Sequence, residues 1–440
     1  MAARARAASG GASASARGAS STATDSPRRA STHRPPPLEH RILVTATLCL
    51  LAFGSVMVYS ASAPLGVLAS GGGGTGTSEF VRYLAAGAVG LVAMQVLSKR
   101  GLSIITPRLV ALMVLGSLGL LLLVLLPGFG RGIQGARRWF SAGPIQFQPS
   151  EVMKLALVLY TARYLADHPR RLRSLRTTIG PIALVAGPAL LLILVEPDLG
   201  TALVLAFTLT ALLVAVGMPM RKLALMAGIA GVLVLALVAL EPYRAARLAA
   251  FLHPWSAANR AAGGYQAVQG QIALGSGGLF GVGLGKSVQK LFYVPEVQSD
   301  FILSVIGEEL GVVGIAGVIC LYGMIAYAGL RTARRAAGRY AKLLATGLTS
   351  LILCQGLLNI FVVLGLAPLT GVPLPFISYA PTNLCIMLAA VGLLLNIASP
   401  GARLRLVDSP KRERPEDRDR RRRDRRARRA GAGGGRGASG

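Results

Sequence analysis

The chain has 440 residues, of which 53% are hydrophobic and only 15% are charged, and its mean hydropathy is +0.56. A soluble globular protein carries about 25% charged residues, so this composition excludes an ordinary soluble domain. The 47 Lys and Arg residues outnumber the 18 Asp and Glu residues, but much of this excess lies near the two ends of the chain.

Two tails enclose the apolar part of the chain. Residues 1–40 are rich in Ala, Ser, Arg and Pro, and residues 399–440 are strongly basic. Neither tail has enough apolar residues to bury a core, so we expect both to be disordered in the cytoplasm. A basic tail can contact anionic lipids, whereas no aromatic residues are interleaved to favour nucleic-acid binding. We therefore expect a membrane contact or a solvated tail, and no nucleic acid.

Ten apolar segments follow one another between the tails, most of them near the length of about 20 residues that crosses a bilayer. The fourth is short and the fifth contains Pro188, so both need neighbouring helices to cover their backbone. The sequence therefore predicts an all-α polytopic membrane domain over residues 41–398, with a large extracytoplasmic loop between the seventh and eighth helices. The ten segments are 42–60, 80–97, 109–126, 152–165, 179–195, 199–216, 223–240, 312–330, 343–365 and 382–397.

The distribution of basic residues predicts the orientation of these helices. Connections rich in Arg and Lys alternate with connections at 61–78, 196–198 and 366–378 that contain neither. By the positive-inside rule, both termini of this multi-pass protein lie in the cytoplasm. The outer loop at 127–150 departs from the rule because it contains three arginines, among them Arg138. This excess of positive charge suggests a task such as holding an anion.

The cysteines and histidines give no support for metal chemistry. The four cysteines lie in apolar segments without a CxxC pair, and the four histidines are scattered without ligand spacing. A disulfide framework or a zinc site is therefore not expected. We predict no metal site formed by protein side chains.

Ten acidic residues remain between residues 42 and 398, few enough to consider singly. Ionisable groups at membrane depth are functional candidates. Glu151 and Lys154 are spaced i and i+3 at the start of the fourth helix and could pair. Asp198, after Glu196 and Pro197, is well placed to cap the sixth helix.

Asp300 lies just before an apolar run that begins at Phe301. Desolvation at the edge of an apolar wall disfavours an ionised carboxylate, which would bring its pKa toward the range of a general base. A second role, as the N-cap of the helix that starts near Phe301, is compatible with the first.

A series of glycines between residues 275 and 285 precedes Lys286 and Ser287. It superficially matches a phosphate-binding P-loop, but Phe280 stands where that motif requires its first glycine. The segment is also expected outside the cytoplasm, so we reject a nucleotide site. A flexible loop and a backbone that approaches a diphosphate both remain open.

Five ordered motifs resemble the FtsW/RodA/SpoVE (SEDS) family of bacterial shape, elongation, division and sporulation proteins, most of all its FtsW branch. The resemblance implies a peptidoglycan glycosyltransferase that polymerises lipid II at the outer face of the bacterial cytoplasmic membrane during cell division. It also implies a class B penicillin-binding transpeptidase and other divisome proteins as partners. The motifs are GARRWFSAGPIQFQPSE at 135–151, EPDLGT at 196–201, GVGLGKSVQKLFYVPE at 281–296, SDFILSVIGEELG at 299–311 and PLPFISY at 373–379.

The resemblance also implies roles for individual residues. Asp300 matches the acidic residue proposed to be catalytic in the family. Candidate substrate-binding residues in the matching motifs are Arg138, Glu151, Lys154, Lys286, Ser378 and Tyr379.

The chemistry of lipid II fits such a set. Its sugar is attached to a diphosphate, so polymerisation must deprotonate an acceptor hydroxyl and stabilise charge on the departing diphosphate. We assign the first task to Asp300 and the second to Arg138 and Lys154, and a divalent cation remains open. Conversion of an axial diphosphate into an equatorial glycosidic bond inverts the anomeric centre, which requires a base and no enzymic nucleophile.

The chain departs from the family pattern at two places. Ala380–Asn383 replace the usual Gly-Gly-Ser-Ser, so either the loop is reshaped or its contact is lost. Gln298 and Ser299 replace the usual His and Thr before Asp300. Two alternative functions therefore stay open, a flippase for lipid-linked precursors and an inactive scaffold that recruits the transpeptidase.

Overall fold

The computed structural model describes the apolar domain and the ends of the segments that adjoin it. The predicted tails lie outside the described residues except for residues 37–40 and Ser399. The described residues are 37–69, 77–127, 129–133, 136–142, 145–169, 175–240, 242–256, 264–291 and 297–399.

Long helices occupy all ten of the predicted positions, and within the described residues of the predicted outer loop there are two shorter helices. The long helices are α1 (Leu38–Ala69), α2 (Ser78–Ile104), α3 (Pro107–Leu125), α4 (Pro149–Asp167), α5 (Leu175–Val195), α6 (Leu199–Ala215), α7 (Met220–Leu240), α11 (Ile302–Arg335), α12 (Arg339–Val363) and α13 (Pro381–Ala398). The shorter helices are α8 (Pro242–Leu252) and α10 (Tyr265–Gly277). The expected large loop therefore lies between α7 and α11 and is partly helical.

Among the described residues, six helices are long and apolar enough to span a membrane, namely α1, α2, α3, α11, α12 and α13. Two shorter apolar stretches belong to α5 and α6. The outward faces of the bundle carry large exposed apolar side chains such as Val92 of α2, Leu112 of α3 and Leu184 of α5. An apolar surface on the outside of a helical bundle is what a lipid environment selects.

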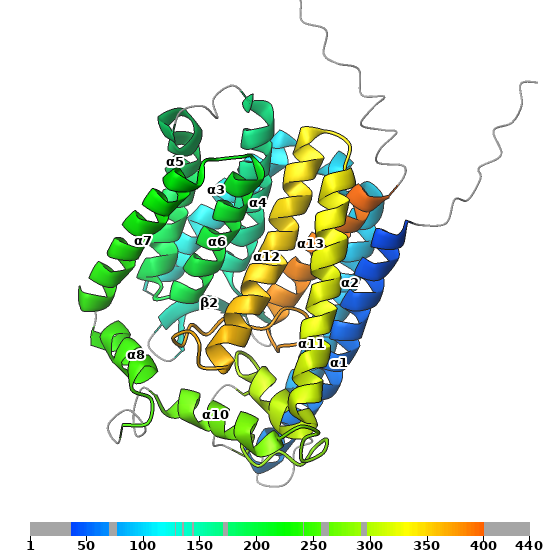
Figure 1. Cartoon of the computed structure of the whole chain (residues 1–440), viewed down its shortest axis with the longest axis vertical. Coiled ribbons are helices and arrows are strands. Elements are labelled where there is room, and N and C mark those ends of the chain that lie inside the picture. The colour runs from blue at the N-terminus through cyan, green and yellow to red at the C-terminus, as the bar shows by residue number, and fades with distance from the viewer. Residues whose placement is uncertain are drawn as a thin grey trace, which may run out of the picture. The chain divides into compact units, whose positions relative to one another are not determined.

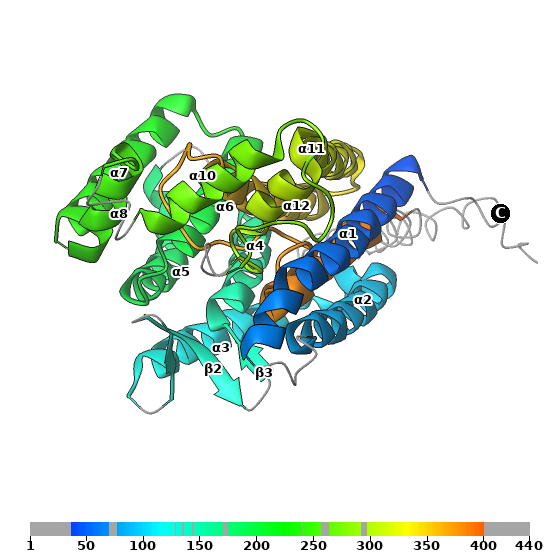
Figure 2. The ribbon, with the colours of Figure 1, turned by 90° about the horizontal axis from the view of Figure 1, so that it is seen from below.

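Helices α4, α12 and α13 form the interior of the bundle. The most apolar window of α13 is 78% buried and that of α12 is 67% buried, against 28% for α2 and α3. Helix α12 packs against α4, α6 and α11, while α13 packs along α2 and α1 packs along α11 (Figures 1 and 2). The polar residues of α4, including Glu151 and Lys154, are therefore enclosed by other helices.

The loop before α4 contains a small antiparallel sheet that the all-α prediction did not include. Its strands are β1 (Arg131–Ile133), β2 (Ala136–Ala142) and β3 (Ile145–Phe147), in the order β1-β2-β3. Phe140 of β2 pairs with Phe147 of β3. Two of the strands have only three residues each, which is too short for an alternating pattern to distinguish them from a loop.

Helix α11 is broken at Gly311, where φ is 67° and ψ is −161°. This backbone conformation is open to glycine and strained for other residues. Residues 312–335 correspond to the predicted eighth span, and Ile302–Leu310 form an additional helical segment before it. Asp300 directly precedes this additional segment.

The two ends of the bundle differ. The first residues of α1 and the last of α13 lie at the same end as the α4–α5, α6–α7 and α11–α12 connections (Figure 1). The strands, α8, α10 and the α12–α13 loop lie at the opposite end. The predicted site residues in loops belong to this second end, which we call the outer end.

Candidate active site

Most of the predicted site residues gather around the loop between α12 and α13, residues 364–380; Lys286 is the exception. Side chains of α2, α11 and α12 donate hydrogen bonds to four of its backbone carbonyls. A buried carbonyl without a donor is costly, so these side chains fix the course of the loop. The Tyr83 hydroxyl of α2 donates to Phe376 O at 2.6 Å and that of Tyr322 of α11 to Pro375 O at 2.5 Å. From α12, the Gln355 amide donates to Pro373 O at 2.9 Å and the Asn359 amide to Val372 O at 2.7 Å.

Asp300 is half-buried and its carboxylate faces this loop. Oδ1 accepts a hydrogen bond from the Ser299 hydroxyl at 3.3 Å, and Oδ2 lies 3.7 Å from the position that a Cβ would occupy on Gly371. The Asn359 amide also donates to the backbone carbonyl of Asp300 at 2.7 Å. The N-cap of α11 is Phe301, without a side-chain capping bond, so the alternative role of Asp300 as an N-cap is not observed.

Arg138, on β2, binds the turn between α5 and α6. Its Nε donates to the carbonyl of Glu196 at 2.8 Å, and Nη2 donates to the carbonyl of Pro197. Asp198 caps α6 by accepting from the backbone N–H of Thr201 at 3.1 Å, which confirms the predicted cap. Because backbone carbonyls carry no net charge, these two bonds orient the guanidinium without neutralising it.

The same turn lies against the α12–α13 loop. A Cβ on Gly200, in the first turn of α6, would stand 2.6 Å from the carbonyl oxygen of Thr370, so only glycine permits this approach. Gly371, the next residue of the loop, faces Asp300. The Arg138-bound turn and Asp300 are therefore both held against one short stretch of the loop.

Glu196 is fully buried, and within the described residues neither of its carboxylate oxygens has a hydrogen-bond partner. Burial raises the pKa of Glu196 from 4.5 to about 8, nearby Asp198 adds to this rise, and Arg138 opposes it. At neutral pH the side chain is therefore mostly protonated, which leaves the charge of Arg138 available to an anion. The sequence placed Glu196 only beside Pro197 and gave no sign of its burial.

Glu151 and Lys154 form the predicted ion pair, with 2.8 Å between Nζ and Oε2. The side chains are 2% and 1% exposed. Lys154 also donates to Oε1 of Gln355 at 2.6 Å, and the Asn383 amide donates to Glu151 at 2.7 Å. The pair thus links α4 to α12 and α13, and through Gln355 it supports the loop. The positive charge of Lys154 is balanced by Glu151 in this arrangement.

The segment Ala380–Asn383, which departs from the family pattern, contacts β3 and α4. Pro381 is the first residue of α13. The Thr382 hydroxyl donates to Gln146 O of β3 at 3.1 Å and accepts from the backbone N–H of Gln148 at 3.4 Å. With Asn383 bound to Glu151, the segment is joined to both β3 and α4 by the side chains that replace the two serines of the family pattern.

Of the remaining predicted residues, Ser378 and Tyr379 belong to the α12–α13 loop, whereas Lys286 does not. Ser378 accepts from Leu374 N at 2.8 Å, and Tyr379 N–H donates to Gln298 O at 2.9 Å, which ties the loop to the segment of Asp300. Burial raises the pKa of the Tyr379 phenol, and a hydrogen bond with Arg82 opposes the rise. Lys286 is exposed on the segment after α10, and the structure does not bring it to the others.

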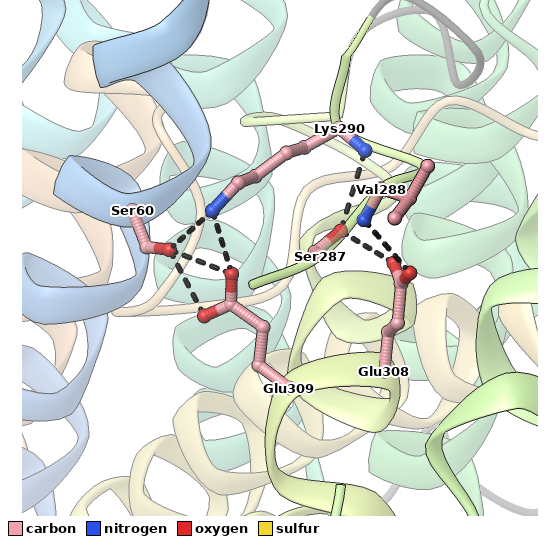
Figure 3. Close-up of polar contacts among 6 residues, drawn as sticks. All are labelled: Ser60, Ser287, Val288, Lys290, Glu308 and Glu309. Atoms are coloured by element: carbon pink, nitrogen blue, oxygen red, sulfur yellow. Dashed lines mark hydrogen bonds and ion pairs between the residues drawn. The ribbon is translucent and has the colours of Figure 1, made fainter. Parts of the chain in front are cut away.

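A second buried polar cluster was not identified from the sequence (Figure 3). Glu309 Oε1 lies 2.8 Å from Lys290 Nζ and accepts a hydrogen bond from Ser60 Oγ of α1 at 2.8 Å. The adjacent Glu308 accepts from Ser287 Oγ and from Val288 N at 3.0 Å. Lys290 lies in a matching motif and the two glutamates are among the ten acidic residues of the domain, but only the fold shows that they meet.

No group of three or more His, Cys, Asp or Glu side chains is placed to hold a metal ion in the described part of the chain. The described residues do not form a cation site of their own. Among the predicted site residues that the structure describes at the outer end, Asp300 faces the α12–α13 loop stretch at Thr370 and Gly371 with its carboxylate, and the guanidinium of Arg138 binds the turn that is held against the same stretch.

Comparisons with known proteins match the membrane domain as a whole. The profile of the FtsW/RodA/SpoVE family, described as cell cycle protein, matches residues 41–401. Stage V sporulation protein E of Bacillus subtilis is 38% identical over 359 residues, covering 81% of this chain and 96% of that protein. The probable peptidoglycan glycosyltransferase FtsW of Pseudomonas fluorescens is 39% identical over 359 residues, covering 81% and 86%.

Solved structures share the fold. A chain from a peptidoglycan synthase complex that coordinates polymerization and crosslinking has a TM-score of 0.64 and 30% identity, covering 81% of this chain and 96% of that one. The rod shape determining protein RodA of Thermus thermophilus has a TM-score of 0.57 and 30% identity, covering 81% and 95%. The match over the whole membrane domain, in sequence and in fold, shows that this multi-pass membrane protein belongs to the FtsW/RodA/SpoVE family.

Proposed function

We propose that this protein is a peptidoglycan glycosyltransferase that polymerises lipid II at the outer face of the bacterial cytoplasmic membrane, in the service of cell division. The observation that carries the proposal is the half-buried carboxylate of Asp300, which faces the same loop stretch that the Arg138-bound turn contacts. The glycosyltransferase names of relatives such as FtsW of Pseudomonas fluorescens support it.

The proposed reaction assigns one task to each charged group. Asp300 accepts the proton of the acceptor sugar's hydroxyl as its oxygen forms a bond to the anomeric carbon of the donor. The bond between that carbon and the diphosphate breaks, and Arg138 stabilises the charge that develops on the departing diphosphate. Attack from the face opposite the leaving group inverts the anomeric centre. Lys154, which the sequence assigned to the diphosphate together with Arg138, instead supports the loop through Gln355.

The likeness to a chain of a peptidoglycan synthase complex supports a partner for this chain. We propose a class B penicillin-binding transpeptidase, which would crosslink the glycan that this chain makes, together with other divisome proteins. The proposed orientation puts both termini in the cytoplasm, so the outer end with Asp300 faces the compartment in which peptidoglycan is assembled.

The experiment is a polymerisation assay with labelled lipid II, using the full chain with its transpeptidase partner and separating the products on a gel. We expect polymer from the wild type and none from Asp300→Asn, which keeps the size of the side chain and removes its basicity. Asp167→Asn, at an exposed carboxylate of α4 paired with Arg163, is the matched control and should polymerise like the wild type.

The alternatives are distinguished by this assay and by a separate transfer assay in liposomes. Equal polymer from the wild type and Asp300→Asn would remove Asp300 from its role. No polymer from either, with an active family member run in parallel, would favour the scaffold, which the replacement at Ala380–Asn383 motivates. Transfer of labelled lipid II across liposomes by both proteins would favour the flippase.

A further inference from the structure

Residues 278–291, between α10 and the segment of Asp300, form a glycine-rich segment with two unlike sides. Two of its polar side chains, Ser287 and Lys290, are 3% exposed and point toward the bundle (Figure 3). Its large apolar side chains point outward. They are Leu279 (67% exposed), Phe280 (80%), Val282 (40%), Leu284 (56%), Val288 (57%) and Leu291 (41%). This is the reverse of what water selects for a surface segment.

The backbone of the segment completes the broken helix α11. Val282 N donates to Glu308 O at 2.9 Å and Gly283 N to Glu309 O at 3.0 Å. In return, Gly278 O accepts from Val312 N at 3.1 Å, and Leu279 O accepts from Val313 N at 3.2 Å. The break at Gly311 frees backbone groups that the segment then satisfies.

Several polar groups in the second half of the segment also bond inward, while Gln289 Oε1 is buried without a partner within the described residues. Ser287 Oγ accepts from Lys290 N at 3.3 Å, which closes a turn, and Glu308 accepts from Val288 N at 3.0 Å. Lys290 Nζ binds Glu309 and Ser60 Oγ, the latter at 3.1 Å. Pairing polar groups inward while apolar groups face out is what a segment needs at a depth where little water is present.

The outward side of the segment continues the lipid-facing surface of the spanning helices. Val312 and Val313, which bind its backbone, are 55% and 58% exposed and begin the long part of α11. On α1, next to Ser60, Tyr59 is 49% exposed. The segment is therefore bonded directly to exposed apolar residues of the long part of α11.

We propose that residues 278–291 are embedded in the outer leaflet of the membrane, with Phe280 and Leu284 among the acyl chains. The occupant of this apolar surface is lipid, because the surface is continuous with that of the membrane-spanning helices. Lys286, exposed in the middle of the segment, extends its ammonium group to the lipid headgroups while its aliphatic stem remains with the apolar side chains. The proposal does not depend on catalysis by Asp300.

The test uses tryptophan fluorescence of the full chain in nanodiscs, in which both membrane faces are accessible. Phe280→Trp and, as a second probe, Leu284→Trp are compared with the wild type, whose emission from Trp139 and Trp255 is subtracted. We expect brominated phosphatidylcholine to quench the added emission strongly and iodide to quench it little. Val313→Trp is the lipid-exposed reference, and Asp167→Trp, at a 59% exposed side chain, is the water-exposed reference.

The opposite pattern would overturn the proposal. Probes quenched by iodide and not by brominated lipid would place the segment in water. Iodide quenching that is lost only after the transpeptidase partner is added would assign the apolar side to a protein contact instead. Gel filtration of each variant, with a single peak at the wild-type volume, confirms that the probes report on folded protein.

Discussion

Two buried glutamates near the outer end, Glu151 and Glu196, avoid the cost of an unpaired buried charge in different ways. The Glu151–Lys154 pair has its charges matched at 2.8 Å and its further hydrogen bonds supplied by Gln355 and Asn383. Glu196 has no such partner within the described residues and is instead held in its protonated form by burial. The two arrangements lead to different predictions.

The stability of the protein should depend on pH through Glu196. Its folded pKa, about 8, lies above the ordinary value of 4.5, so the folded state keeps a proton that the unfolded state releases. The contribution of Glu196 to stability is therefore largest below pH 4.5 and falls as the pH rises toward 8. Glu196→Gln imitates the protonated form, so its melting temperature should gain on that of the wild type between pH 5 and about pH 8. A difference that does not change over this interval would contradict protonated burial.

Removing one member of the buried pair should be far worse than replacing both. Lys154→Met leaves Glu151 ionised and without its cation in the bundle, which we expect to cost about 3–5 kcal/mol of unfolding free energy. Glu151→Gln combined with Lys154→Met removes both charges and should recover most of that loss. Unfolding of the purified variants in mixed micelles measures both. A double variant as unstable as Lys154→Met would show that the charges are not the cause.

At the scale of elements, the connections at the outer end are positioned by the helices they touch. The α12–α13 loop has no regular structure, yet the tyrosine hydroxyls of α2 and α11 and the amides of α12 hold four of its carbonyls. The glycine-rich segment is held in turn by the break in α11. The orientation of Asp300 is therefore a property of several helices packed together.

Gly281 and Gly285 have similar φ angles, so a comparison of their alanine variants separates backbone strain from packing in the glycine-rich segment. Gly281 has φ +79° and Gly285 has φ +78°, so alanine is strained at both by about 1–2 kcal/mol. A Cβ at Gly281 would also stand 2.5 Å from Leu310 N, whereas at Gly285 nothing lies within 4 Å. We expect Gly281→Ala to lower the melting temperature and the polymerisation rate clearly more than Gly285→Ala. Equal effects would mean that the segment is not packed on α11.

At the scale of the whole molecule, the basic connections lie at the same end of the bundle as the start of α1 and the end of α13 (Figure 1). If both termini are cytoplasmic, alkaline phosphatase fused after residue 252, at the end of α8, should be active because it is exported. The same enzyme fused after residue 399 should be inactive, while a fluorescent protein at that position should fluoresce. Active phosphatase at residue 399 would reverse the proposed orientation and place Asp300 in the cytoplasm.

Much of the fold follows from apolar length and charge alone. The ten predicted segments match ten helices because a bilayer requires long apolar helices, whatever their neighbours. Strands β1 and β3 were missed because Arg131–Ile133 and Ile145–Phe147 are too short to show a period. The cap of α6 could also be predicted from the sequence, because the N–H of Thr201 donates to Asp198, which is only three residues away.

By itself, the sequence determined the membrane class, the order of the helices, the local Glu151–Lys154 pair and the candidate carboxylate Asp300, because each depends on residues close together in the chain. Only the tertiary structure decided that Asp300 faces Gly371, that Glu196 is buried without a partner, and that Lys290 pairs with Glu309 and Ser60 while Lys286 is exposed. These contacts join segments up to hundreds of residues apart, and burial, which determines whether a charge is paired or protonated, exists only after the helices have packed.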